Sequence, residues 1–309
     1  MSAAVPLTFR SGRLPADPDR PSLKLSPAAA VLPAPPVSSD WLSPVPVASL
    51  GMQGNDDWGD CTCAGVAHKR IGDCFVNQGV TLSVATAQTL ALYSAVTGFN
   101  PNAGAPGSNP TDNGAMCQDV LEYWQEHGFL GEKIVAFAKV DLGNITEVKQ
   151  AIAVFGQIYT GFNFPGSAMD QFNAGQPWDV VKGASIEGGH CVTIGAYDAT
   201  YLACVTWGAV QKLTWAFLKE YFDEAWVIVT QDMINAASGD DVLRLSLFQL
   251  GQDFAVLTGS PNPIPAPAPQ PSPAPAPVPP SPTPAPTPGH CTCAQLVAAI
   301  KDVFKKMGV

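Results

Sequence analysis

The sequence predicts an α+β domain in which a helical first half is followed by a β-rich second half. Apolar residues recur at helical spacing between residues 61 and 127, whereas the stretch from 157 to 230 is rich in β-branched and aromatic residues. Beyond residue 260, a proline-rich tract ends the globular pattern. Helices and strands that are segregated along the chain are typical of α+β folds, and we expect a cleft between the two parts.

Three helices are expected in the first half, at residues 61–76, 85–96 and 116–127. In the first helix, apolar residues such as Ile71 recur every three or four positions. Gly128 ends the third helix, because glycine commonly follows the last residue of a helix.

The second half is expected to form strands and one further helix. Residues 146–155 place their apolar side chains on one face, which predicts a short amphipathic helix. The remaining segments are dense in β-branched and aromatic residues, which predicts strands. These strands are expected at residues 133–140, 157–164, 190–197, 201–206 and 225–230. Residues 242–257 are a candidate for a closing helix.

Composition narrows the classes of protein to consider. Charged residues make up only 14% of the chain and its net charge is −10, so the basic surface that a nucleic-acid-binding protein needs is lacking. The sequence contains no run of about 20 apolar residues, the length needed to span a membrane. The N-terminus lacks the apolar core of a signal peptide. We therefore expect a cytoplasmic or virion-associated protein whose cysteines are mostly reduced.

Four segments are predicted along the chain. Residues 1–39 form an N-terminal arm, either extended over the domain or unstructured, and residues 40–259 form the globular domain. Half of residues 260–289 are proline, and such a linker favours polyproline II at about 3.1 Å per residue. Residues 290–309 have the pattern of an amphipathic helix. On a long tether, such a helix predicts docking to a protein partner, to another copy of the chain or to a membrane surface.

Only four histidines are present, and one of them suits the role of a general base. His68 lies two helical turns, or about 10 Å, from Cys61, which is too far for direct proton transfer. His127 ends a predicted helix with no sign of a cleft nearby, and His290 lies beyond the linker. His190 begins a predicted strand and follows two glycines, which permit close approach of another backbone.

Two thiols compete for the role of nucleophile. Cys61 stands at the predicted start of a helix, where the helix dipole and free N–H groups stabilise a thiolate. Cys63 lies deeper in the first turn and points elsewhere, so Cys61 is the stronger candidate. Other cysteines are expected to fill the core, because cysteine is among the most often buried residue types. These are Cys74, Cys117, Cys191 and Cys204.

The residues around the candidate thiol and histidine carry a family resemblance. The run Asn55-Asp56-Asp57-Trp58-Gly59-Asp60-Cys61 resembles the Gln-x-x-x-Gly-x-Cys element of papain-like cysteine peptidases. Three more segments resemble elements of the family. Ser39-Asp40-Trp41 resembles the Asp-Trp near the start of the mature domain, and Thr206-Trp207-Gly208 resembles Asn-Ser-Trp-Gly. Gly189-His190 with Gly195-Ala196-Tyr197-Asp198 resembles the histidine strand and its Gly-Tyr turn. The resemblance spans residues 40–230 and extends to uncharacterised papain-like proteins of bacteria and phages.

This resemblance implies a two-part papain-like domain and the activity of a cysteine peptidase. Such a thiol protease hydrolyses peptide or isopeptide bonds of a peptide or protein substrate and needs no cofactor or metal. The resemblance implies that Cys61 attacks the carbonyl and His190 transfers the proton. It also implies that the Asn55 side-chain amide and the Cys61 backbone N–H stabilise the oxyanion.

The chain departs from the family pattern at two positions. Asn55 replaces a glutamine with a shorter side chain that still offers an amide donor. The asparagine that orients the histidine is missing, and its place falls on Val205 or Thr206 depending on the alignment. Only the Thr206 side chain could hydrogen-bond the imidazole. Loss of the usual orienting group leaves an alternative open, a catalytically weak or inactive binding or structural module, for example on a phage particle.

Two other patterns in the sequence are not expected to form a metal site. Cys61-Thr62-Cys63 is echoed by Cys291-Thr292-Cys293, but zinc sites usually use Cys-x-x-Cys spacing, so no metal is expected. A disulfide from the tail to another chain is a further option. The acidic residues before the thiol are expected to lie in a solvated loop: Asp56, Asp57 and Asp60.

Overall fold

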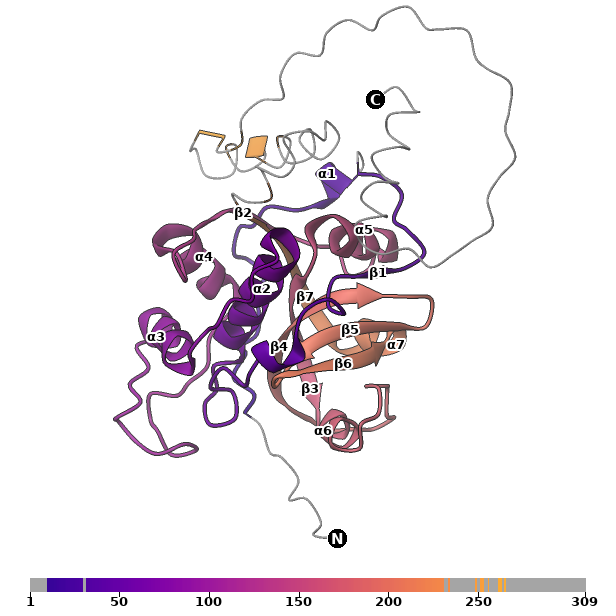
Figure 1. The fold of residues 1–309 in the computed structure, drawn as a ribbon. Helices are drawn as coiled ribbons and strands as arrows, with labels where there is room; N and C mark the ends of the chain where they lie inside the picture. The colour runs from indigo at the N-terminus through magenta and orange to yellow at the C-terminus, as the bar shows by residue number, and fades with distance from the viewer. Residues whose placement is uncertain are drawn as a thin grey trace, which may run out of the picture.

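The computed structural model describes residues 10–29 and 32–230, together with single positions at 233, 248, 251, 252, 255, 261, 262 and 264. The linker at 260–289 and the closing helix predicted at 242–257 fall almost entirely outside these residues. The helix predicted at 290–309 lies wholly outside them. Within the described residues, the α+β class is confirmed: helices pack on an antiparallel sheet (Figure 1).

A seven-stranded antiparallel sheet forms the centre of the fold. Six strands follow the order β2-β7-β3-β4-β5-β6, and β1 pairs with β4. The strands are β1 (Ser39–Asp40), β2 (Ile134–Lys139), β3 (Ile158–Pro165), β4 (Ile186–Tyr197), β5 (Tyr201–Thr206), β6 (Ala209–Thr214) and β7 (Phe222–Thr230). Because β4 lies in the middle of the sheet and pairs with both β3 and β5, residues on β4 have fixed neighbours on two sides.

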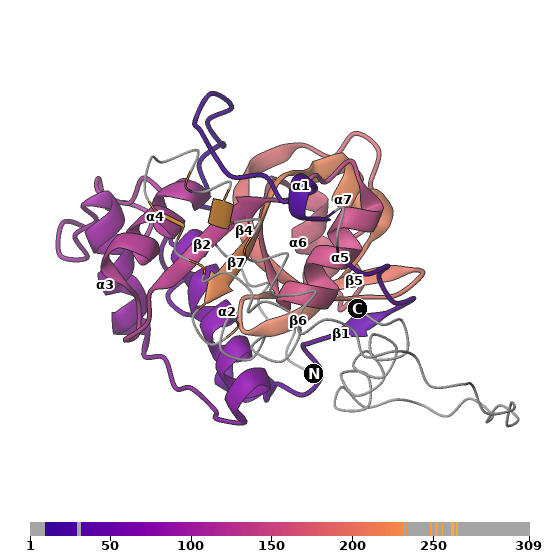
Figure 2. The same cartoon turned by 90° about the horizontal axis from the view of Figure 1, so that it is seen from above.

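The helices cover the sheet and extend the molecule to one side. They are α1 (Ser26–Ala29), α2 (Cys61–Gln78), α3 (Thr86–Thr97), α4 (Cys117–His127), α5 (Ile145–Phe155), α6 (Gly166–Asn173) and α7 (Trp215–Tyr221), with a 3₁₀ turn at Val47–Ser49. Glycines in the left-handed region end α2 and α3, at Gly79 (φ 69°) and Gly98 (φ 76°). In both views α3 and α4 lie at one end of the molecule, and α5 and α7 lie at the other (Figure 2).

Two apolar cores hold these parts together. One contains Phe155 of α5, Phe217 of α7 and residues of the sheet. The other contains Ile71 of α2, Trp124 of α4 and residues of β4 and β7. The first twelve residues of α2 are all buried. A helix buried in this way cannot move without disrupting the packing around it. Its N-terminus therefore holds a reactive group in a fixed position.

Part of the N-terminal arm is built into the domain. The backbone of the arm pairs with β2, since Leu25 N–H donates to Lys139 O and Lys139 N–H donates to Leu23 O, both at 2.8 Å. The side chains of Leu23 and Leu25 are buried in the first core. The irregularly spaced leucines of the arm therefore contribute to the packing of the sheet.

The prediction missed three elements of the second half, namely α6, β6 and α7. Helix α6 and helix α7 have only eight and seven residues, too few for a clear helical period. Strand β6 follows β5 through a two-residue turn at Trp207-Gly208, with φ of 47° and 71°. Hairpin turns with two positive φ values usually contain Asn or Asp before the glycine. Because a tryptophan stands there instead, the sequence gives no signal for this hairpin.

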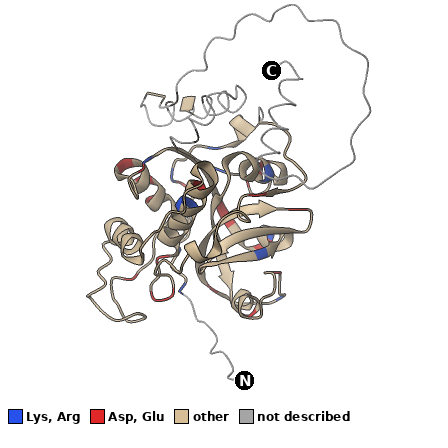
Figure 3. Cartoon of the chain, in the orientation of Figure 1, with Lys and Arg blue, Asp and Glu red and all other residues tan. Residues whose placement is uncertain are grey.

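Charged residues are few and scattered over the described elements (Figure 3). Among the helices described, none combines the length and the apolar character needed to cross a membrane. All six cysteines of the described residues are buried and free of disulfides.

Candidate active site

Cys61 is the first residue of α2, as the sequence predicted. The helix begins after Asp60, whose carbonyl oxygen accepts from the N–H groups of Cys63 at 2.8 Å and Ala64 at 2.9 Å. Cys61 is 1% exposed. Burial raises the pKa of its thiol to about 12, although backbone hydrogen bonds from Gly12 and Cys191 act in the opposite direction. In this state the thiol is neutral at physiological pH.

Cys63, the competing thiol, is also fully buried, and burial raises its pKa well above the ordinary value. Backbone hydrogen bonds from Gly12 of the arm and from Cys191 of β4 act on the Cys61 thiol. Cys61 therefore lies beside the histidine strand.

Asp60 does not lie in solvent as expected, although Asp56 and Asp57 are exposed. Its side chain is buried, and burial raises the pKa of its carboxyl group well above the usual range. The expectation failed because three acidic residues within five positions suggest a solvated loop, whereas Asp60 directly precedes the buried helix. The charge of the Asp60 carboxyl group also acts on the neighbouring thiol, where it raises the pKa of Cys61.

The Asn55 side-chain amide has a fixed orientation. Its Oδ1 accepts from Trp207 Nε1 at 2.8 Å, and its Nδ2 donates to the carbonyl oxygens of Trp58 and Arg10, each at 3.0 Å. An indole nitrogen can only donate, so the two ends of the amide cannot be exchanged. The amide donor that the resemblance assigns to the oxyanion therefore points at a backbone carbonyl of the arm.

His190 and Thr206 lie within hydrogen-bond distance of one another. His190 Nε2 is 2.9 Å from Thr206 Oγ1, so Thr206 rather than Val205 meets the imidazole. The other ring nitrogen, Nδ1, has no hydrogen-bond partner within the described part of the chain. Burial lowers the pKa of His190 to about 3. The imidazole is therefore neutral at physiological pH.

Trp207 covers the histidine. Its ring stacks on the His190 imidazole with the centroids 4.6 Å apart and the planes 22° from parallel. Phe162 and Phe164 of β3 contact the imidazole edge-on. This aromatic enclosure excludes water and favours the neutral imidazole.

The arm crosses the site through residues 10–14, which we call the arm segment. Three backbone hydrogen bonds tie the segment to two parts of the domain: Arg13 N–H to Gly189 O at 3.0 Å, Leu14 N–H to Ala115 O at 2.9 Å, and Ala115 N–H to Gly12 O at 2.9 Å. A fourth, from Arg10 N–H to Asn55 O, measures 3.3 Å. The arm segment thus lies between the loop before α4 and the start of the histidine strand.

Glycines make this close approach feasible. A Cβ atom on Gly12 would lie 1.8 Å from the carbonyl oxygen of Gly59. Across the site, a Cβ atom on Gly189 would lie 2.3 Å from Arg13 O, and one on Gly188 would lie 2.3 Å from Ser11 Oγ. The glycine pair before His190, which the sequence associated with close backbone approach, faces the arm segment.

The sequence reading missed the partners of Arg13, a residue that it placed in the arm without a role. The Arg13 side chain is 1% exposed and pairs with Glu224 and Asp223 on β7. No local pattern marks such a pair. The only available signal was an acidic pair, Asp223-Glu224, at the start of a strand that is otherwise apolar.

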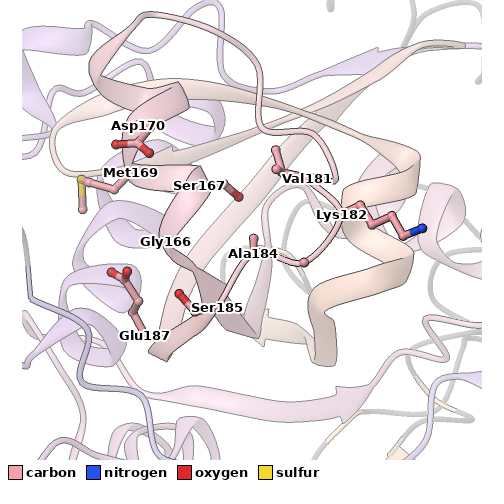
Figure 4. Close-up of a pocket in the computed structure, with 10 residues that line it drawn as sticks. Gly166, Ser167, Met169, Asp170, Val181, Lys182, Ala184, Ser185 and Glu187 are labelled. Atoms are coloured by element: carbon pink, nitrogen blue, oxygen red, sulfur yellow. The ribbon is translucent and has the colours of Figure 1, made fainter.

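A separate surface hollow of about 490 Å³ lies between α6 and the loop before β4 (Figure 4). Its walls include Asp170, Lys182, Ser185 and Glu187, and no cysteine or histidine lines it. Within the described residues, no group of three metal-ligating side chains is close enough to hold an ion. Cys291 and Cys293 lie outside those residues, so the absence of a metal stays a prediction.

No protein-family model matches the chain, and no curated protein matches it in sequence. Solved structures do resemble it in fold. Xylellain, a cysteine protease from Xylella fastidiosa, has a TM-score of 0.56 and 17% identity over 74% of this chain and 99% of its own. Procathepsin B S9 from Trypanosoma congolense has a TM-score of 0.50 and 12% identity over 72% of this chain and 87% of its own. The described chain therefore has the two-part fold of papain-like cysteine proteases.

Proposed function

We propose that the chain is a cysteine-dependent hydrolase of peptide or isopeptide bonds, with Cys61 and His190 as its catalytic pair. The observation that carries the proposal is the position of Asn55 Nδ2. It donates at 3.0 Å to a carbonyl of the arm segment, whose next residues reach the buried thiol at the start of α2. A side-chain amide that already donates to a peptide carbonyl, two residues before the glycine whose backbone hydrogen-bonds the thiol, supports an oxyanion site.

The reaction would begin with proton transfer from the Cys61 thiol to His190 Nδ1, while Nε2 stays bonded to Thr206. The thiolate attacks the substrate carbonyl carbon, and the oxyanion accepts from Asn55 Nδ2 and the Cys61 backbone N–H. The tetrahedral intermediate collapses to a thioester as His190 returns its proton to the leaving amine. Water then hydrolyses the thioester and regenerates the thiol.

The closed arm gives this proposal a testable condition. With the arm segment in place, both partners are neutral, since the thiol has a pKa of about 12 and the imidazole a pKa of about 3. Desolvation is the largest cause of both shifts. Displacing the arm would admit water and substrate, lower the thiol pKa and raise that of the imidazole. We therefore infer that the chain is latent until the arm segment leaves.

The deciding experiment measures alkylation of Cys61 by iodoacetamide against pH, with the modified residue located by mass spectrometry. It uses the full chain, the Arg13→Gln variant that weakens the hold of the arm, and the same variant carrying His190→Ala. Labelling of Arg13→Gln that is rapid below about pH 7 and is lost with His190→Ala supports the pair. Labelling that follows an ordinary thiol pKa near about 8.5, with or without His190, contradicts it and favours a binding module.

Hydrolysis is then tested on a fluorogenic peptide library, with Cys61→Ala as the inactive control. Turnover that survives Cys61→Ala would assign any hydrolysis to another residue.

The chain beyond the linker has a separate proposed role. Residues 290–309, which lie outside the described residues, are proposed as a docking helix for a protein partner or a second copy. Deleting residues 291–309 should change the oligomeric state or partner recovery and leave the melting temperature of the domain unchanged. An unchanged oligomeric state and unchanged recovery would refute this role.

A further inference from the structure

The arm segment carries a buried arginine whose guanidinium is held by two carboxylates. Arg13 Nε donates to Glu224 Oε1 at 2.8 Å, and Nη1 donates to Asp223 Oδ2 at 3.0 Å. Nη2 also pairs with Asp223, at 2.5 Å, and with Glu224, at 2.6 Å. The side chains of Arg13 and Glu224 are each 1% exposed, whereas Asp223 is 38% exposed. The two carboxylates thus bind every nitrogen of the guanidinium.

The domain leaves room for this one side chain. Gly161 pairs with Glu224 in the β3–β7 ladder, and a Cβ atom on Gly161 would lie 2.6 Å from Arg13 Nε. A Cβ atom on Gly189 would lie 3.3 Å from Arg13 Cδ. Any side chain at position 161 would fill the space that the guanidinium occupies. We call the space bounded by Gly161, Gly189 and Glu224 the acidic pocket.

The acidic pocket opens beside the candidate thiol. The residue preceding Arg13, Gly12, is the one whose backbone hydrogen-bonds the Cys61 sulfur. Arg13 itself donates its N–H to Gly189 O, and Gly189 directly precedes His190. A peptide whose backbone lies at the thiol therefore extends a neighbouring side chain into the acidic pocket.

The pocket keeps the carboxyl groups of Glu224 and Asp223 when the arm leaves. Glu224 keeps a hydrogen bond from Trp226 Nε1 at 2.9 Å, which satisfies one carboxylate oxygen and supplies no positive charge. A buried carboxylate without a cation is strongly unfavourable. A neutral side chain would leave Glu224 in that condition, whereas a guanidinium restores the pairing that Arg13 makes.

We propose that the acidic pocket is a substrate subsite that selects an arginine side chain, with Glu224 and Asp223 as its specificity residues. Arg13 occupies the subsite in the closed chain, and an arginine of the substrate replaces it in the open one. Lysine should bind less well, because a single ammonium cannot reproduce the planar fork that spans both carboxylates. This inference rests on the proposed function, because the bound arginine belongs to a substrate only if the chain is a hydrolase. The pocket's preference for a guanidinium can be tested without turnover.

The first test compares fluorogenic peptides that carry Arg, Lys, citrulline or Leu at each of the two positions before the scissile bond. Citrulline has the shape of arginine without its charge. In the full-length Arg13→Gln chain, kcat/KM for Arg at one position should exceed that for citrulline by on the order of 10² or more. Adding Glu224→Gln should remove most of this ratio. Adding Glu220→Gln, an acid exposed on α7, should leave the ratio unchanged. Turnover with no preference for Arg overturns the pocket and leaves the proposed function standing.

The second test measures binding alone. Agmatine, a small guanidine, should raise the melting temperature of Arg13→Gln, and it should not raise that of Arg13→Gln/Glu224→Gln. If no peptide is hydrolysed while agmatine still stabilises only the chain with Glu224, the proposed function fails and the guanidinium pocket stands. If agmatine stabilises both chains equally or neither, the pocket is refuted. Should Arg13→Gln fail to fold, Arg13→Lys keeps a cation in the pocket and takes its place in both tests.

Discussion

The indole N–H of Trp207 donates a 2.8 Å hydrogen bond to the side-chain carbonyl oxygen of Asn55, across 152 residues of sequence. The same indole stacks on the imidazole of His190. Trp207 therefore fixes the direction of the candidate oxyanion donor and shields the candidate base. Its φ of 47° is uncommon for a bulky residue, and such strain is typical of functional positions.

Replacing Trp207 by Phe should lower the free energy of unfolding by about 1–3 kcal/mol, because Asn55 Oδ1 would be left buried without a donor. Urea unfolding measures the change. Trp215→Phe is the matched control, since Trp215 Nε1 likewise donates one hydrogen bond, but to the backbone carbonyl of Asp198 at an exposed site. Equal losses of unfolding free energy in the two variants would show that the buried hydrogen bond to Asn55 stabilises the fold no more than the exposed one to Asp198.

Thr206→Val should slow both turnover and Cys61 alkylation in the Arg13→Gln chain by tenfold or more. A positioned base contributes on the order of 10²–10⁴ in rate. The valine keeps the volume and removes the hydrogen bond to Thr206, the one side-chain hydrogen bond of the imidazole within the described residues. Thr206→Ser keeps the hydroxyl and should restore most of the rate. The comparison is made as rate against pH, because a loss of stability alone would not alter the pH profile.

Stability should fall as the pH drops below about 6.5. Burial lowers the folded-state pKa of His190 to about 3 and that of His68 to about 4, against 6.5 for an ordinary histidine. Between these values the unfolded chain binds protons that the folded chain cannot bind, so acid favours unfolding. Each histidine costs at most about 1.4 kcal/mol per pH unit in this window.

Urea unfolding at pH 7.5, 6.5, 5.5 and 4.5 measures this slope. His127, which is largely exposed, provides the control: His127→Gln should leave the slope unchanged. A free energy of unfolding that is flat between pH 6.5 and 4.5 would show that both buried imidazoles take up protons in the folded chain.

Gly12→Ala should expose the Cys61 thiol. The added Cβ atom would lie 1.8 Å from Gly59 O, so the arm segment must move away from the start of α2. Alkylation of Cys61 should rise about tenfold for each 1.4 kcal/mol that the clash removes from the closed state. Mass spectrometry locates the label.

Leu14→Ala is the control for this experiment, because the Leu14 side chain is 41% exposed and its backbone hydrogen bond survives the change. If Gly12→Ala and Leu14→Ala label at the rate of the unaltered chain, the arm segment does not limit access to the thiol.

The helices α2, α3, α4 and α5 and most of the strands could be predicted from the sequence, because each has a local period of apolar residues. Cys61 at a helix start and His190 on a strand followed from the same patterns. Elements α6, β6 and α7 are too short, or begin at too unusual a turn, for periodicity to reveal them. Asp60 was placed in solvent because neighbouring acidic residues suggest a solvated loop, and no local pattern shows that tertiary packing buries the residue before α2.

The sequence by itself determined the fold class, the order of the thiol and histidine elements and the resemblance to papain-like peptidases, since these depend on near neighbours along the chain. Only the tertiary structure decided that Thr206 meets the imidazole, that Asn55 holds a carbonyl of the arm, and that Arg13 lies against Glu224. Arg13 and Glu224 are 211 residues apart. A contact at such separation forms when the sheet and the arm pack around shared apolar residues, and no local pattern encodes which polar side chains that packing brings together.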